Sequence, residues 1–330
     1  MASAPLLSVR RLRVHYPKRG LLPWTRSRTV RAIDDLHFDL QPGETLGIVG
    51  ESGCGKSTLA RTLVGLQDAS GGSIRYQGQE LIGLDRKTWK PLRRDVQLVF
   101  QDPLGSLSPK MKVLDIVAEP LKALMPEVPA DQRKARAMAL LARVGLGDEI
   151  ADRRASELSG GQAQRVGIAR ALIVEPKLLI CDEPVSALDV SIQAQIINLL
   201  SDLARERNLA MIFIAHDLAV VRQLADRVLV MYLGKVMEQG RADDVYAHPR
   251  HPYTRALLEA VPVIAAEGEA PKRRKRLGGP AANPGQPPMG CVFHPRCPLV
   301  EHACVQSVPG LRKVEGAEQY AACHFVAAGG

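Results

Sequence analysis

The sequence predicts an α/β fold built on a mostly parallel sheet, with an antiparallel β subdomain, a helical insert and a cysteine-rich C-terminal extension. From about Gly161 onward, short apolar runs of strand length alternate with longer amphipathic runs, which is the order that produces a parallel sheet. A glycine-rich motif at residues 50–57, between an apolar strand and a helical run, is the second observation. The alternating elements are the strands 177–181 and 211–215 and the helices 190–206 and 218–224.

The first half of the chain changes character near residue 100. Short β-rich runs at 12–16, 32–40 and 45–49 predict a sheet-rich opening, because turn signals separate them. Between residues 114 and 144 the apolar residues instead fall at helical spacing, and Gly145 is a plausible helix stop. This stretch predicts a helical insert.

At roughly 150 residues per domain, the length of 330 residues suggests about two domains, and composition divides the chain into three parts. Residues 1–264 are expected to form the main domain, with about 102–160 as the helical insert. Residues 265–290 are rich in proline and glycine and carry a basic run at 272–276, which is typical of an exposed linker. Residues 291–330 hold four of the six cysteines.

The net charge is +9, from 44 Lys and Arg against 35 Asp and Glu, and it suits nucleic acid, acidic lipid or a phosphorylated ligand equally well. The N-terminus lacks the pattern of a secretory signal, and no apolar stretch approaches the ~20 residues that span a bilayer. We therefore expect a cytoplasmic chain that depends on a partner if it works at a membrane.

Residues 50–57, GESGCGKS, fit the phosphate-binding P-loop motif in the strand-to-helix context that it requires. Backbone N–H groups of such a loop point at phosphate, Lys56 would reach the β- and γ-phosphates, and the hydroxyl of Ser57 would bind Mg²⁺. A chance match in a chain of this length is on the order of one in a hundred. The motif predicts a P-loop NTPase core. The expected ATP contacts are Gly50, Ser52, Gly53, Cys54, Gly55, Lys56, Ser57 and Thr58.

Two acids end the apolar run 178–181, at the edge of an α/β sheet where ligands bind. Asp182 is expected to hold Mg²⁺ indirectly or through water, and Glu183 to polarise a water for attack on the γ-phosphate. Together with the P-loop, this pair predicts nucleotide hydrolysis.

Residues 158–162, LSGGQ, form a polar turn directly before a helix, which is a second place suited to an anion. Here the sequence resembles the ATP-binding cassette (ABC) ATPases, whose signature motif is LSGGQ. The resemblance implies that the signature turn of one subunit completes the ATP site of another. The residues expected to act on a partner's ATP are Ser159, Gly160, Gly161 and Gln162.

Further motifs match this family in order along residues 8–260. Gln101 matches the Q-loop glutamine, which the resemblance assigns to Mg²⁺ and the attacking water. Asp189 matches the D-loop at the dimer interface, and His216 matches the switch histidine at the γ-phosphate. Tyr16 stands where an aromatic residue stacks on adenine. The resemblance thus implies Glu183, His216 and Gln101 as the catalytic set, and Ser57, Gln101 and Asp182 as the Mg²⁺ set.

Within the family the pattern is most similar to ATPase subunits of bacterial dipeptide and oligopeptide importers, and the loop 18–29 resembles an insertion of their F-type subunit. This implies a peripheral ATPase on the cytoplasmic face of the inner membrane. Its implied partners are a second, distinct ATPase subunit, two membrane permeases and, indirectly, a periplasmic binding protein, with no nucleic acid. Import of another small solute (nickel, glutathione or a sugar) stays open, and a soluble nucleic-acid ATPase is disfavoured by the 4% aromatic content.

Four cysteines follow the linker at spacings wider than the paired C-x2-4-C of most four-cysteine zinc sites. The region resembles the tail of peptide-importer ATPases, which in some relatives carries a [4Fe–4S] cluster. We expect such a cluster, with Zn²⁺ or free thiols as the alternatives. Its expected ligands are Cys291, Cys297, Cys304 and Cys323.

Overall fold

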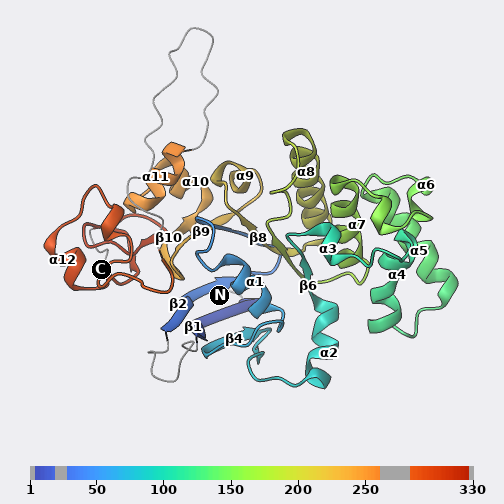
Figure 1. The fold of residues 1–330 in the computed structure, drawn as a ribbon, viewed down its shortest axis with the longest axis horizontal. Coiled ribbons are helices and arrows are strands. Elements are labelled where there is room, and N and C mark those ends of the chain that lie inside the picture. Colours follow the sequence, from blue (N-terminus) through green and yellow to red (C-terminus); the bar gives the residue numbers. More distant parts are fainter. Residues whose placement is uncertain (1–3, 19–27, 261–282, 327–330) are drawn as a thin grey trace, which may run out of the picture.

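The computed structural model describes residues 4–18, 28–260 and 283–326 (Figure 1). Most of the predicted linker, with its basic run at 272–276, and most of the loop 18–29 lie outside these ranges. Within them the chain forms two sheets, and the helical subdomain and the C-terminal region lie at opposite ends of the long axis (Figure 1).

The smaller sheet is antiparallel and contains β1 (Leu7–Lys18), β2 (Arg28–Leu40), β4 (Gly71–Tyr76) and β5 (Gln79–Glu80), in the order β2-β1-β4-β5. Alternate residues of β1 and β2, such as Val9 and Ile33, are fully buried, as expected for strands with one face on a core. The predicted antiparallel subdomain is therefore present.

The larger sheet has eight strands in the order β11-β12-β10-β9-β3-β8-β7-β6. In this order, the five strands from β9 to β6 each pair in parallel with the next. Every residue of β3, β7 and β8 is buried. Continuous burial is typical of parallel strands covered on both faces, so the predicted parallel core is confirmed. These five strands are β9 (Arg227–Tyr232), β3 (Thr45–Val49), β8 (Ala210–Ala215), β7 (Leu178–Asp182) and β6 (Val96–Val99).

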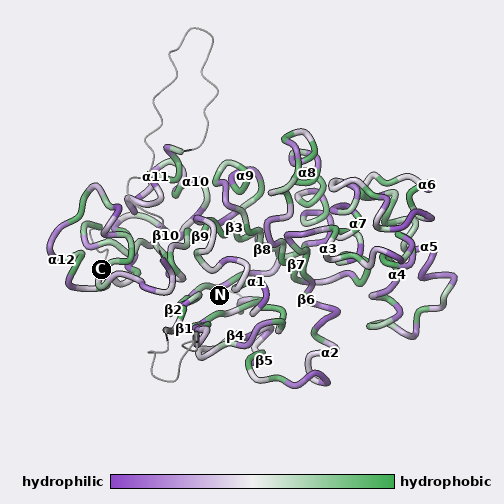
Figure 2. Tube along the Cα trace, in the orientation of Figure 1, coloured by the Kyte–Doolittle hydropathy of each residue, from purple (hydrophilic) through white to green (hydrophobic). Residues whose placement is uncertain are grey.

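Six helices of the described residues lie next to strands of the larger sheet in the order of the chain. Helix α8 buries Ile196, Leu200 and Leu203, which belong to the apolar stripe seen in the sequence, and its N-cap is Asp189. Helix α2 is mostly hydrophilic and buries only Trp89 (Figure 2). The helices are α1 (Lys56–Leu63), α2 (Arg86–Asp95), α8 (Val190–Arg207), α9 (Leu218–Arg222), α10 (Ala242–Ala247) and α11 (Pro252–Ala260).

A helical subdomain follows β6, as the apolar spacing predicts. Its helices pack around Ile116, Val117, Leu121, Leu140 and Leu141, all of which are buried. The helices α4, α5 and α7 contact one another. The elements are α3 (Pro103–Ser106), α4 (Val113–Leu124), α5 (Ala130–Arg143), α6 (Asp148–Ala151), the 3-10 helix η1 (Ala155–Glu157) and α7 (Gly160–Leu172).

The C-terminal region is joined to the larger sheet through β10 (Lys235–Arg241). Strand β12 (Gln319–Ala321) pairs with β10 and also with β11 (Arg312–Lys313). The fully buried carboxylate of Glu238 accepts hydrogen bonds from the backbone amides of Arg250 and His251 and from the side chain of Gln319. One buried acid thus ties the start of α11 to the last strand. Two further short helices are η2 (His294–Arg296) and α12 (His302–Gln306).

Among the described residues, no helix combines the length and the apolar character needed to cross a membrane.

His251 provides a test of this attachment. Its side chain is 1% exposed, and its Nδ1 accepts a hydrogen bond of 3.0 Å from the amide of Tyr253. Burial lowers the pKa of His251 from 6.5 to about 4. Between these values the unfolded chain takes up a proton that the folded chain excludes, so stability must fall as the pH is lowered through this window.

We expect His251→Asn, which keeps a hydrogen-bond acceptor but cannot be protonated, to lose this pH dependence. From pH 6.5 down to about pH 4, the free energy of unfolding of the wild type should fall relative to the variant by up to about 1.4 kcal/mol per pH unit. Urea unfolding at a series of pH values measures this difference. A constant difference across the window would contradict the buried neutral imidazole.

Candidate active site

The P-loop connects β3 to α1 and surrounds the side chain of Lys56. The lysine Nζ donates hydrogen bonds to the backbone oxygens of Gly50, at 2.7 Å, and Glu51, at 3.2 Å. Its side chain is only 3% exposed, and Nζ lies 3.6 Å from Oε1 of Glu183. A buried ammonium group in a curled backbone loop is the arrangement suited to a polyphosphate.

The curl depends on glycine at two positions. Gly55 has a φ of +108°, and a Cβ there would lie 2.1 Å from the backbone oxygen of Ala32. At Gly50 a Cβ would lie 2.2 Å from the backbone oxygen of Met231. Both neighbours are backbone atoms of adjoining strands, so they cannot rotate away. The buried thiol of Cys54, whose pKa burial raises, fills the inside of the loop.

The predicted Mg²⁺ residues Ser57 and Asp182 come together across the sheet edge. The Ser57 hydroxyl donates a 3.0 Å hydrogen bond to Oδ1 of Asp182, from the first turn of α1 to the end of β7. Burial, reinforced by the charge of Glu183, raises the pKa of Asp182, and the hydrogen bond from Ser57 opposes this shift. A hydroxyl and a carboxylate at this spacing are hard oxygen donors.

Glu183 occupies a strained backbone position directly after β7. Its φ is +46°, which is uncommon for a residue with a side chain, and its amide donates a 3.0 Å hydrogen bond to the oxygen of Ile214. Its carboxylate accepts a 3.0 Å hydrogen bond from Nε2 of Gln101, which leaves the amide oxygen of Gln101 as an acceptor. Strained residues of this kind cluster at functional sites.

His216 follows β8 and is exposed. It lines a small cavity of about 50 Å³ together with Glu183, Ser186 and Asp217. The structure therefore brings the three predicted catalytic residues to one edge of the sheet.

The remaining predicted contacts are exposed or half-buried. Ser159 caps α7: its hydroxyl accepts from the amide of Gln162, and the side-chain oxygen of Gln162 accepts from the amide of Ser159. This capping box leaves the first turn of α7, with Gly160 and Gly161, open to a partner. Asp189 caps α8, and Tyr16 on β1 is 37% exposed. Ser52 and Gly53 are also exposed, whereas Thr58 is half-buried in α1.

Sequence reasoning missed two residues that contact the P-loop. The hydroxyl of Tyr253 accepts a 2.9 Å hydrogen bond from the amide of Glu51. The guanidinium of Arg296 lies 2.7 Å from a carboxylate oxygen of the same Glu51. The run HPYTRALL, which contains Tyr253, was the available signal.

The four C-terminal cysteines are all free thiols. Burial raises the pKa of Cys291, and the charges of Cys304, Cys297 and Cys323 raise it further. Nevertheless, within 4–18, 28–260 and 283–326 no three His, Cys, Asp or Glu side chains form a group that could hold a metal ion. The expected cluster is therefore not supported by the geometry, and neither is the zinc alternative.

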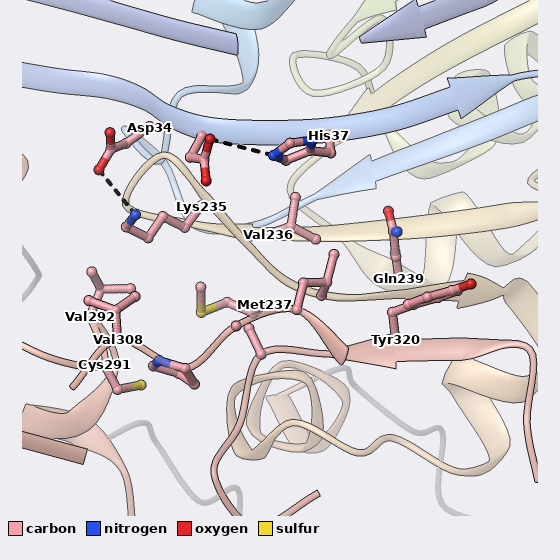
Figure 3. A pocket seen from close by; sticks show the side chains of 15 residues that line it. Asp34, His37, Lys235, Val236, Met237, Gln239, Cys291, Val292, Val308 and Tyr320 are labelled. Atoms are coloured by element: carbon pink, nitrogen blue, oxygen red, sulfur yellow. Dashed lines mark ion pairs between the residues drawn. The ribbon is translucent and has the colours of Figure 1, made fainter. Parts of the chain in front are cut away.

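A cavity of about 480 Å³ lies between β2, β10 and the C-terminal region (Figure 3). Asp34 and Lys235 form a 3.0 Å ion pair at one side of it, and Cys291 and Val308 line the other. None of the expected nucleotide-binding residues lines this cavity, so it is separate from the P-loop site.

The P-loop, the paired acids at the end of β7 and the parallel sheet define an ATPase of the P-loop class. Comparison with known proteins narrows the class. Residues 33–186 match the model of the ABC transporter family, and residues 237–304 match that of the oligopeptide/dipeptide transporter C-terminal region. The chain belongs to the ABC transporter family, as an ATPase subunit.

Its relatives are transport ATP-binding proteins. The chain is 50% identical to the oligopeptide transport ATP-binding protein OppF of Salmonella typhimurium, over 93% of this chain and 92% of that protein. It is 46% identical to AppF of Bacillus subtilis, an oligopeptide transport protein, and 46% identical to the di/tripeptide transport protein DppF of Pseudomonas aeruginosa. Each of these two matches covers 97% of both chains.

Solved structures agree with the fold. The dimeric post-hydrolysis structure of the ATP-binding cassette MJ0796, bound to ADP and Pi, matches with a TM-score of 0.65 and 28% identity, covering 72% of this chain and 98% of that one. CbiO1 of Clostridium perfringens, part of an ABC transporter complex, matches with a TM-score of 0.63 and 31% identity, covering 74% and 92%.

The P-loop geometry predicts unequal effects of alanine at two glycines. Gly53→Ala should cost only the strain of a φ of +79°, since a Cβ there meets nothing within 4 Å. Gly55→Ala adds a clash with the backbone of β2, and we expect it to lower the free energy of unfolding by about 2 kcal/mol more than Gly53→Ala. Denaturant unfolding without nucleotide measures both. Equal losses would contradict the packing of the loop against Ala32.

Proposed function

We propose that this ATPase powers an importer of oligopeptides or dipeptides across the bacterial inner membrane, from a peripheral position on its cytoplasmic face. The observation that carries the proposal is the convergence of Lys56, Ser57, Asp182, Glu183 and Gln101 at one sheet edge. The names of the relatives and the match of residues 237–304 support a peptide cargo.

In the proposed reaction Lys56 and the P-loop amides bind the β- and γ-phosphates of ATP. The oxygens of Ser57, Asp182 and Gln101 suit Mg²⁺, which would neutralise phosphate charge when bound. Glu183 accepts the proton of the attacking water, and the hydrogen bond from Gln101 holds the Glu183 carboxylate in place. His216, at the same cavity, donates to the γ-phosphate as negative charge develops there.

We further propose that two cassettes share each ATP. At the start of α7 Gly160 is exposed and Gly161 half-buried, and their amides at the helix N-terminus suit the phosphates of a nucleotide held by a partner. We assign the exposed Asp189 to the same interface, because it matches the D-loop. The F-type resemblance favours a distinct second ATPase subunit. Gln101 would relay closure of the two ATPase subunits to two membrane permeases. The permeases would receive peptide from a periplasmic binding protein.

Glu183→Gln tests the reaction. The amide keeps the size of the side chain but cannot accept the proton of water, so we expect ATP turnover to fall about a hundredfold or more while ATP binding is retained. Steady-state ATPase assays and equilibrium ATP binding, with and without the membrane subunits, measure this. The control is Glu149→Gln, an exposed carboxylate on α6.

Equal turnover in wild type and Glu183→Gln would exclude Glu183 as the base. ATP turnover that is unchanged by the membrane subunits but increased by DNA or RNA would contradict the importer and support a nucleic-acid ATPase.

For the C-terminal region we propose that Cys291, Cys297, Cys304 and Cys323 ligate a [4Fe–4S] cluster, which would cross-link the region when bound. The spacing of the four cysteines, which is wider than the paired C-x2-4-C of most four-cysteine zinc sites, supports a cluster over a single zinc ion, and so does the resemblance to the tail of peptide-importer ATPases. Protein purified without oxygen should contain about four iron and four sulfide per chain, and Cys297→Ser should lower both. Colourless, iron-free protein would exclude the cluster.

A further inference from the structure

The C-terminal region contacts the P-loop at Glu51. Glu51 follows Gly50, so its carboxylate adds negative charge to a loop built to receive an anion. Like charges repel each other, so an uncompensated carboxylate on Glu51 would weaken the binding of a polyphosphate to the same loop. Its side chain is 30% exposed, which leaves this charge only partly screened by water.

Arg296 compensates this charge from 245 residues further along the chain. Its Nη1 donates a 2.7 Å hydrogen bond to Oε2 of Glu51. The side chain of Arg296 is 8% exposed, and its Nη1 also lies 3.4 Å from the hydroxyl of Tyr232. The hydrogen bond to Glu51 raises the pKa of Arg296, in keeping with a strong charge-assisted contact.

The turn that carries Arg296 is held firmly against the ATPase core. Phe293 is fully buried and packs edge-on against Tyr232, with ring centroids 5.4 Å apart, and against Tyr253 at 5.2 Å. Inside the turn, the amide of Arg296 donates to the oxygen of Phe293 at 3.0 Å. Because the backbone is fixed at both ends of this short segment, the guanidinium has a defined position over the loop.

We propose that Arg296 is a positioning residue of the ATP site, which neutralises and holds Glu51 so that the P-loop accepts the phosphates of ATP. The inference rests on the proposed nucleotide site. It assigns to the C-terminal region a direct role in nucleotide affinity, in addition to its attachment to β10.

The test is the dissociation constant of Mg–ATP for the full-length chain. Arg296→Gln leaves the carboxylate uncompensated, and we expect about tenfold weaker binding, or about 1.4 kcal/mol. Glu51→Gln removes the offending charge, so it should bind ATP at least as tightly as the wild type. The double variant Arg296→Gln with Glu51→Gln should recover most of the lost affinity, and Arg296→Lys should retain part of it.

Two comparisons separate charge compensation from a general effect. Lys313→Gln breaks a 2.7 Å ion pair with Glu318 in the same C-terminal region and should leave ATP affinity unchanged. The defect of Arg296→Gln should shrink at about 1 M salt, where the Debye length is about 3 Å.

If Arg296→Gln and Glu51→Gln weaken ATP binding to the same extent, the ion pair only maintains the structure of the loop, and the proposal is overturned. If Arg296→Gln folds poorly, unimpaired binding by Glu51→Gln still supports compensation, and weakened binding still overturns it. A wild-type chain that binds ATP no better than Arg296→Gln overturns the inference alone. A wild-type chain that binds no ATP overturns the proposed function, and the inference with it.

Discussion

The parallel register of four neighbouring strands determines where every proposed catalytic residue lies. Val49 pairs with Ala215, Phe213 with Cys181, and Cys181 with Val99, so the carboxyl ends of β3, β8, β7 and β6 finish at one edge. The P-loop, His216, the two acids and Gln101 are the residues that follow these ends. A shift of one strand by two residues would move the catalytic residue at its end by about 7 Å. The buried apolar side chains of the strands fix the register and thereby keep the catalytic residues together.

The same edge concentrates unfavourable terms that the surrounding structure has to offset. Asp182 is buried with a raised pKa, Lys56 is buried as an ammonium group, and Glu183 has a positive φ. Each would destabilise an isolated loop by about 1 to 3 kcal/mol. They persist because each polar group has a partner within 3.6 Å and because the strands behind them are completely buried. Bound phosphates would place negative charge next to Lys56, and Mg²⁺ would place positive charge next to Asp182, so both buried groups would be better compensated in the bound state than in the empty one.

Local sequence patterns predicted the parts of the fold that depend on neighbouring residues. Three elements can each be recognised from a short stretch of sequence: the strand before the P-loop, the apolar run ending in Asp182 and the apolar stripe of α8. The roles of the site residues came from ordered motifs, and the geometry brings most of them together. The pairing of β12 with β10 through three residues has no such pattern, since Gln319 is polar and Glu238 is an acid in a fully buried position. The contact between Arg296 and Glu51 is equally invisible, because only the fold brings those positions together.

The C-terminal region is best understood through what it contacts. The cassette MJ0796 is 98% covered by 72% of this chain, so a complete cassette can be built from fewer residues than this protein has. Contacts that serve only to attach extra residues have no reason to reach the P-loop, and the pairing of β12 with β10 already supplies attachment. Yet Tyr253 binds the amide and Arg296 the carboxylate of one P-loop residue, Glu51. Tyr253 belongs to α11, whereas Arg296 belongs to the C-terminal region, and the ring of Phe293 packs against that of Tyr253. The C-terminal region therefore reaches the proposed ATP site through Arg296, and a change in the conformation of the turn that carries Arg296 would alter the charge next to the P-loop.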